Sequence, residues 1–110
     1  MNVKHFIEER LLVFEITEEI DHHMCEIIRR RADYEIQRFM PKRVIFDFNR
    51  VVFMDSAGIG LVIGRYKNVK SFGGTLEMVN VNDKLKKVFE MSGILKLISI
   101  VDSYEKEKIS

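Results

Sequence analysis

The sequence has little of several features that would point to particular classes of protein. Its single cysteine, Cys25, excludes an internal disulfide and a multi-cysteine metal site, and it favours a reducing compartment. The first residues alternate between charged and apolar without the core of a signal peptide, and no apolar run approaches the length of a membrane span. We therefore expect a cytoplasmic protein that does not act at a membrane.

The sequence also lacks a large excess of positive or negative charge. The 18 basic and 17 acidic side chains leave a net charge of +1, so no strong field attracts nucleic acid. What the sequence does have is an ordinary globular composition, with 46% hydrophobic and 32% charged residues. A chain of 110 residues buries an apolar core without metals or disulfides, so we expect residues 1–110 to form a single domain.

Strand-like and helix-like segments alternate along the chain. The expected strands cover residues 3–6, 11–16, 44–48 with its extension 51–53, 76–81 and 97–101. The expected helices cover residues 21–40, 56–72, 82–93 and a short terminal segment from 102 to about 106. This order predicts an α/β fold, with a mixed, mostly parallel sheet that begins with a β-hairpin and packs against about four helices.

Ser56 lies where the central strand ends and a helix begins. In α/β sheets the binding surface lies at the carboxyl ends of the strands, so this serine is the strongest functional lead. Serine is a common helix cap, and one interpretation makes Ser56 the N-cap and Asp55 the end of the strand. The other makes the hydroxyl a site of modification, because a phosphate here would meet the positive end of the helix dipole.

Other chemistry at this junction does not fit the spacing of the residues. The glycine pattern GxGxxxG is one residue longer than a dinucleotide fingerprint, so we interpret Gly60 and Gly64 as glycines that let the helix approach the sheet closely. The nucleophile elbow GxSxG lacks its first glycine before Ser56. His22 and His23 are adjacent and point apart on a helix. We expect no catalytic residue and no metal.

The segment from Phe53 to Gly60 resembles the signature of STAS-domain anti-sigma factor antagonists. Further segments are similar to the sporulation-type members of that family, at residues 20–23, 61–67, 73–74 and 89–96. The likeness runs in order from about Val3 to Val101. It implies a STAS fold, a mixed sheet packed against helices, in a regulatory switch protein that is not an enzyme.

The resemblance also implies partners and a site. Family members bind an anti-sigma factor that is a serine kinase and so free the sigma factor, which is a partner only indirectly. The kinase inactivates them by phosphorylating the motif serine, here Ser56, and a PP2C-type phosphatase reverses this. ATP is then the kinase's cofactor, and the chain needs none. The expected docking surface consists of Asp21, His22, Asp55, Ser56, Gly58, Ile59, Gly60 and Val88.

Two alternative functions stay open. One is a STAS module that senses a nucleotide or another small ligand at the same turn. The other is an antagonist of the general stress response, which differs from the sporulation type only in its partner kinase. Three of the docking residues also have plain structural interpretations, because Asp21 suits a helix cap, Ile59 the edge of the core and Val88 the core itself.

Overall fold

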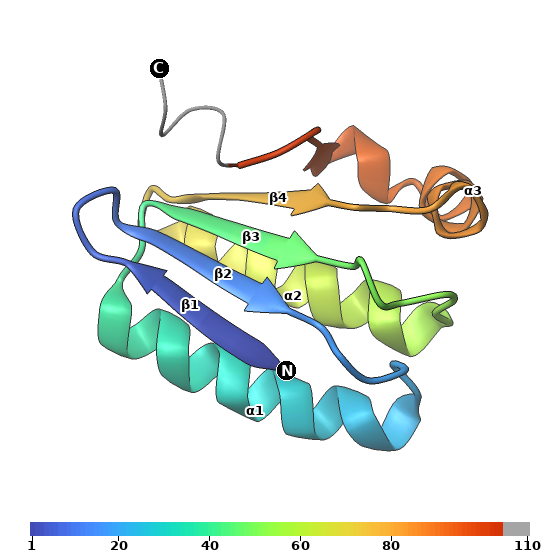
Figure 1. Ribbon diagram of the computed structural model, residues 1–110, viewed down its shortest axis with the longest axis horizontal. Helices are drawn as coiled ribbons and strands as arrows, with labels where there is room; N and C mark the ends of the chain where they lie inside the picture. Colours follow the sequence, from blue (N-terminus) through green and yellow to red (C-terminus); the bar gives the residue numbers. More distant parts are fainter. Residues whose placement is uncertain (105–110) are drawn as a thin grey trace.

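Five strands form one sheet in the order β1-β2-β3-β4-β5 in the computed structural model, which describes residues 1–104 (Figure 1). The strands are β1 (Asn2–Phe6), β2 (Leu11–Glu15), β3 (Arg43–Asp47), β4 (Thr75–Val79) and β5 (Ser99–Ile100). β1 pairs with β2 antiparallel, with Phe6 opposite Leu11, and every other neighbouring pair is parallel. The predicted mixed sheet with an N-terminal hairpin is confirmed.

Helices connect the parallel strands. They are α1 (His22–Phe39), α2 (Ser56–Ser71) and α3 (Asp83–Ser92), followed by a short 3-10 turn, η1 (Ile94–Lys96). α1 and α2 lie side by side against one face of the sheet, and α3 lies beyond the carboxyl end of β4 (Figure 1). The fourth predicted helix does not begin at residue 102, since residues 102–104 are not helical, and its remainder lies outside the described residues.

The helix ends follow the signals in the sequence. Asp21 and Asn82 each accept a hydrogen bond of 2.7 Å from the backbone amide three residues later, so Asp21 caps α1 as predicted and Asn82 caps α3. Met40 takes a left-handed conformation (φ 49°) directly before Pro41, and Gly93 (φ 82°) ends α3. Among the described residues, no helix combines the length and the apolar character that crossing a bilayer requires.

The central strands β2 and β3 are buried on both faces of the sheet. Alternate residues of the central strands point toward α1 and α2, and there the ring of Phe46 packs between Phe14 at 5.4 Å and Phe48 at 5.9 Å. The opposite face carries a smaller apolar cluster of Leu11, Val13, Ile45 and Val79, with Phe6, Val101 and Tyr104 packed against it. This double burial explains why β2 and β3 are nearly continuous apolar runs.

The predicted extension of the central strand through Val51–Phe53 is wrong. β3 ends at Asp47, whose Oδ1 accepts hydrogen bonds from the backbone amide of residue 49 (3.0 Å) and from Nδ2 of Asn80 (2.9 Å). These bonds turn the chain away from the sheet. After β3, the next β-type pairing of this segment is at Met54, which forms an isolated parallel bridge with Ile20.

Candidate functional site

The starts of α1 and α2 are held against each other by a small apolar contact. The bridge between Ile20 and Met54 joins the segments that lead into the two helices. Gly58 packs onto both, and a Cβ atom added there would lie 2.9 Å from Cβ of Met54 and 3.3 Å from Cγ2 of Ile20. Only glycine fits this position without displacing the bridge, so Gly58 brings the two helix starts together.

Asp55, and not Ser56, caps α2. Its Oδ1 accepts hydrogen bonds from the backbone amides of Ala57 (2.9 Å) and Gly58 (3.3 Å), and Ser56 is the first helical residue. The interpretations of Ser56 as the N-cap and of Asp55 as a strand end are therefore wrong. The Ser56 side chain is exposed, and its hydroxyl has no hydrogen-bond partner within residues 1–104. That hydroxyl is open to another molecule.

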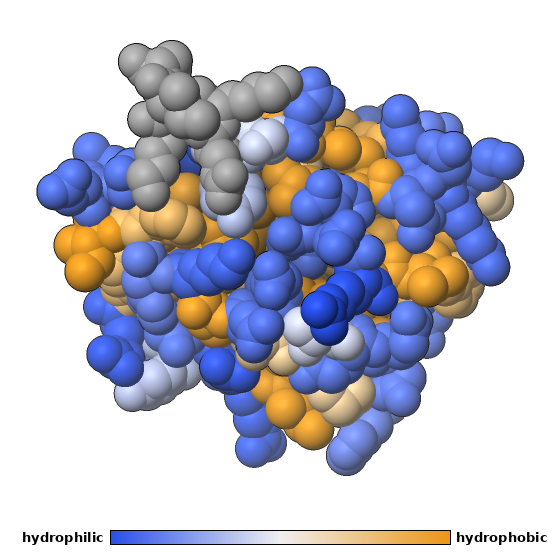
Figure 2. All heavy atoms as spheres, viewed as in Figure 1, coloured by the Kyte–Doolittle hydropathy of each residue, from blue (hydrophilic) through white to orange (hydrophobic). Residues whose placement is uncertain are grey.

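An apolar groove of about 410 Å³ lies beside Ser56, between the start of α2 and α3. Its lining is Phe53, Met54, Asp55, Ser56, Ile59, Val88, Met91 and Ser92. Phe53 is 47% exposed and Met91 is 89% exposed, although both are large and apolar. In Figure 2, apolar surface is visible between polar side chains at the right of the view, where Figure 1 places α3 and the segment after β3. Such a patch is typical of a protein interaction site.

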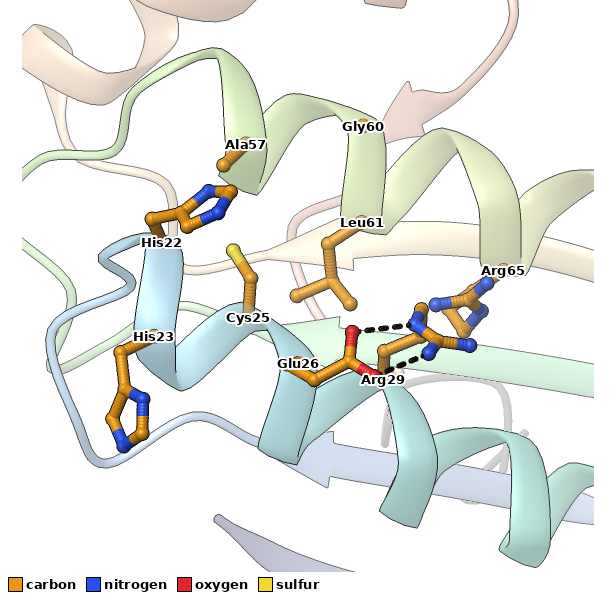
Figure 3. Close-up of a pocket in the computed structure, with 9 residues that line it drawn as sticks. All are labelled: His22, His23, Cys25, Glu26, Arg29, Ala57, Gly60, Leu61 and Arg65. Carbon is orange, nitrogen blue, oxygen red and sulfur yellow. Dashed lines mark hydrogen bonds and ion pairs between the residues drawn. The ribbon is translucent and has the colours of Figure 1, made fainter.

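A second groove, of about 390 Å³, lies on the other side of the α2 start, between α1 and α2 (Figure 3). It is lined by His22, His23, Cys25, Glu26, Arg29, Ala57, Gly60, Leu61 and Arg65. Burial, together with the nearby charges of Asp55 and Asp21, raises the pKa of the Cys25 thiol, so this thiol is not activated as a nucleophile. Within residues 1–104, no three side chains of the metal-binding types come together as a site.

The predicted docking residues lie around the α2 start but divide between the two grooves. Asp55, Ser56, Ile59 and Val88 line the first groove, and His22 and Gly60 line the second. Ile59 is only 9% exposed and belongs to the core, whereas Val88 is half-buried at its edge. Asp21 is exposed while it caps α1. Gly58 is buried beneath the surface, where it acts through packing.

The prediction that Gly60 and Gly64 allow close packing is wrong. A Cβ atom at either position would meet no atom within 4 Å, whereas the close approach is made at Gly58. The spacing of four residues suggested a packing stripe, but Gly60 is exposed, Gly64 is half-buried, and neither has an atom of another segment where a side chain would begin.

Sequence reasoning missed the exposure of Phe53 and Met91 and the position of Arg65 in the second groove. The apolar run places Phe53 in a strand, although the Asn49-Arg50 turn before it interrupts that run. Met91 follows the apolar residues Val88 and Phe89 in α3, yet at 100° per residue it lies about 120° around the helix from Leu85, which is fully buried. For Arg65 the signal was its place four residues after Leu61, on the face of α2 that meets α1.

Comparison with known proteins places this geometry in a family. Residues 4–107 match the model of the STAS domain. The chain is 32% identical to an anti-sigma F factor antagonist of Paenibacillus polymyxa, over 84% of this chain and 80% of the relative. It is 29% identical to an anti-sigma-B factor antagonist of Bacillus subtilis, over 77% of this chain and 76% of the relative.

Solved structures give the same result. The unphosphorylated form of the anti-sigma factor antagonist SpoIIAA superposes with a TM-score of 0.81 at 30% identity, covering 98% of this chain and 91% of that one. The phosphorylated form of the Bacillus protein SpoIIAA superposes with a TM-score of 0.73 at 30% identity, covering 98% and 95%. Structures of SpoIIAA are thus known both with and without phosphorylation.

Proposed function

The chain belongs to the STAS domain family, and from this premise we propose that it is an anti-sigma factor antagonist, switched off by phosphorylation of Ser56. The observation that carries the proposal is the position of Ser56. Its hydroxyl is exposed at the first residue of α2, while Asp55 satisfies the helix amides and an apolar groove lies alongside. Similarity to antagonists of both the F and the B type supports an anti-sigma factor as partner.

The groove and the hydroxyl together suit a partner that is also a serine kinase. Phe53 and Met91 offer exposed apolar area for docking, and Ile59 and Val88 form the floor on which a partner side chain packs. A partner docked there covers Ser56, so its active site can reach the hydroxyl. ATP is the cofactor of that kinase. The antagonist itself requires no cofactor, and it acts on the sigma factor only by occupying the anti-sigma factor.

Electrostatics explains how a phosphate would end the interaction. Phosphorylation of Ser56 adds about −1.5 to −2 charges beside the carboxylate of Asp55. In the free protein this charge stays in water near the positive end of α2, so the fold tolerates it. In the complex the same charge is desolvated against an apolar interface, which is strongly unfavourable. A PP2C-type phosphatase acting in the cytoplasm would restore the binding form.

Mass spectrometry after incubation with an anti-sigma kinase and ATP tests the proposal. We expect a single phosphate on Ser56 and none on the Ser56→Ala variant. Ser92→Ala is the matched control, because Ser92 lines the same groove while its hydroxyl is already bonded to the backbone oxygen of Phe89 at 2.9 Å. Phosphate incorporation that persists in Ser56→Ala would contradict the assigned site. Running the assay with an anti-sigma F factor and an anti-sigma-B factor separately decides which type of antagonist this is.

A further inference from the structure

The groove between α1 and α2 contains a buried arginine that is poorly satisfied. Arg65 is 9% exposed and lines the groove. Its Nε lies 2.9 Å from Oδ1 of Asp33, but Nε and Nη1 are buried and make no well-aligned hydrogen bond within residues 1–104. Burying a guanidinium without partners for its donors is unfavourable. Desolvation, with the nearby Arg29, lowers the pKa of Arg65, and only Asp33 opposes this.

The charges around Arg65 do not balance. Figure 3 shows the guanidinium groups of Arg29 and Arg65 side by side at one end of the groove. Glu26 pairs with both Arg29 and Arg30, and Asp33 pairs with both Arg29 (3.7 Å) and Arg65. Three guanidinium groups therefore share two carboxylates. The cluster as a whole therefore carries one positive charge in excess, and an anion entering at the Arg29 and Arg65 end would balance it.

The rest of the groove has a different character. Toward the other end it is lined by Ala57, Leu61, Cys25 and His22, which point into the space between the helices (Figure 3). These side chains are mostly apolar, and the thiol of Cys25 is held in its neutral form by a raised pKa. The volume of about 390 Å³ lies within the range of small-molecule sites. There is space for an organic group beyond the anion.

We propose that the groove between α1 and α2 binds a phosphate group, with Arg29 and Arg65 as its ligands. Paired guanidinium forks match the several oxygens of a phosphate better than they match a single carboxylate oxygen. The phosphate is carried by a small organic molecule, whose remainder lies against Ala57, Leu61 and Cys25, or it is free inorganic phosphate. The site uses neither Ser56 nor the apolar groove beside α3, so it does not depend on the proposed function.

Titration of the free, ¹⁵N-labelled chain by NMR tests the site without any partner protein. The probes are inorganic phosphate and phenyl phosphate, added at constant ionic strength with sodium chloride as the balancing salt. We expect saturable shifts of the backbone amides of Ala57, Gly60 and Leu61. Tighter binding of phenyl phosphate identifies an organic phosphate ester as the ligand class, and equal affinities identify free phosphate.

Variants locate the phosphate. Arg29→Gln removes a half-exposed guanidinium, so the fold is kept, and we expect phosphate affinity to fall about tenfold because a charge-assisted pair is lost. Arg65→Lys keeps the charge but loses the fork and should weaken binding similarly. Arg38→Gln, on the same helix but outside the groove, is the control and should leave affinity unchanged. Shifts that do not saturate, or equal affinity in Arg29→Gln and Arg38→Gln, would overturn the proposal.

Discussion

At the start of α2, the carboxylate of Asp55 caps the helix and the hydroxyl of Ser56 is exposed. Asp55 is occupied by the amides of Ala57 and Gly58, so Ser56 is not needed to begin the helix. A serine that served as the cap would lose its structural role on phosphorylation. With Asp55 as the cap, the hydroxyl can be modified while α2 stays in place. Two neighbouring residues therefore have separate roles, since Asp55 caps the helix and Ser56 is the proposed site of the switch.

Replacing Ser56 by Asp should weaken binding to the anti-sigma kinase without destabilising the protein. The new carboxylate would lie in the surface proposed to be covered by the partner, and an uncompensated charge in an interface costs affinity, here at least about tenfold. Isothermal titration calorimetry measures the affinity, and thermal unfolding checks the fold. Ser71→Asp adds the same charge at the far end of α2 and should bind normally. Equal affinity of wild type and Ser56→Asp would refute the phosphate switch.

Replacing Asp55 by Ala should instead lower the stability of the protein. The variant loses the N-cap of α2, which typically costs about 1 kcal/mol in the free energy of unfolding. Urea denaturation followed by circular dichroism measures the change, and Ser56→Ala is the neighbouring control, expected to lie within about 0.5 kcal/mol of wild type. If both variants were destabilised equally, Ser56 would share the capping role.

The three glycines of α2 differ in how closely other atoms approach them. Gly58 is needed for the contact with Met54 and Ile20, whereas Gly60 and Gly64 have open space where a side chain would begin. The sequence alone could not separate them, because the pattern GxGxxxG gives spacing along the helix and not the distance to another segment. That distance depends on the bridge between residues 20 and 54, which are far apart in the sequence.

Gly58→Ala and Gly64→Ala should therefore have opposite effects on the free energy of unfolding. The new methyl group at position 58 would lie 2.9 Å from Cβ of Met54, so the helix start must shift, and we expect a loss of roughly 1–3 kcal/mol. At position 64 alanine meets nothing within 4 Å and should gain about 0.5–1 kcal/mol through helix propensity. Chemical denaturation of both variants is the measurement. Stabilisation by Gly58→Ala would contradict the contact.

Most of the fold was predictable because its signals are local. The caps Asp21 and Asn82, the stop at Pro41 and the alternation of strands and helices each depend on residues within a few positions. The motif around Ser56 likewise indicated the family, and it is the basis for proposing Ser56 as the phosphorylation site. The exposure of side chains such as Phe53 and Met91 was not predictable, since exposure depends on which distant segments pack against a side chain.

The two faces of the sheet are covered in different ways, and this affects how the molecule holds together. α1 and α2 cover one face with the main core. On the other face, the segment after β5 brings Tyr104 to Phe6 of β1, and the two ring centroids lie 6.1 Å apart. β1 and β5 are the two edge strands of the sheet, so this contact crosses the sheet. Both rings pack against the small apolar cluster of Leu11, Val13, Ile45 and Val79. This contact joins the beginning and the later part of the described chain.

A double-mutant cycle between Phe6 and Tyr104 tests whether this contact stabilises the fold. Phe6→Ala and Tyr104→Ala should each lower the free energy of unfolding, and the double variant should lose less than the sum, because aromatic pairs contribute about 0.5–1.5 kcal/mol beyond their area. Tyr34, exposed on α1, supplies the control, and Tyr34→Ala should be additive with Phe6→Ala. Additivity in the Phe6 and Tyr104 cycle would mean that the two rings do not stabilise each other, and that each contributes only through its own packing against the small cluster.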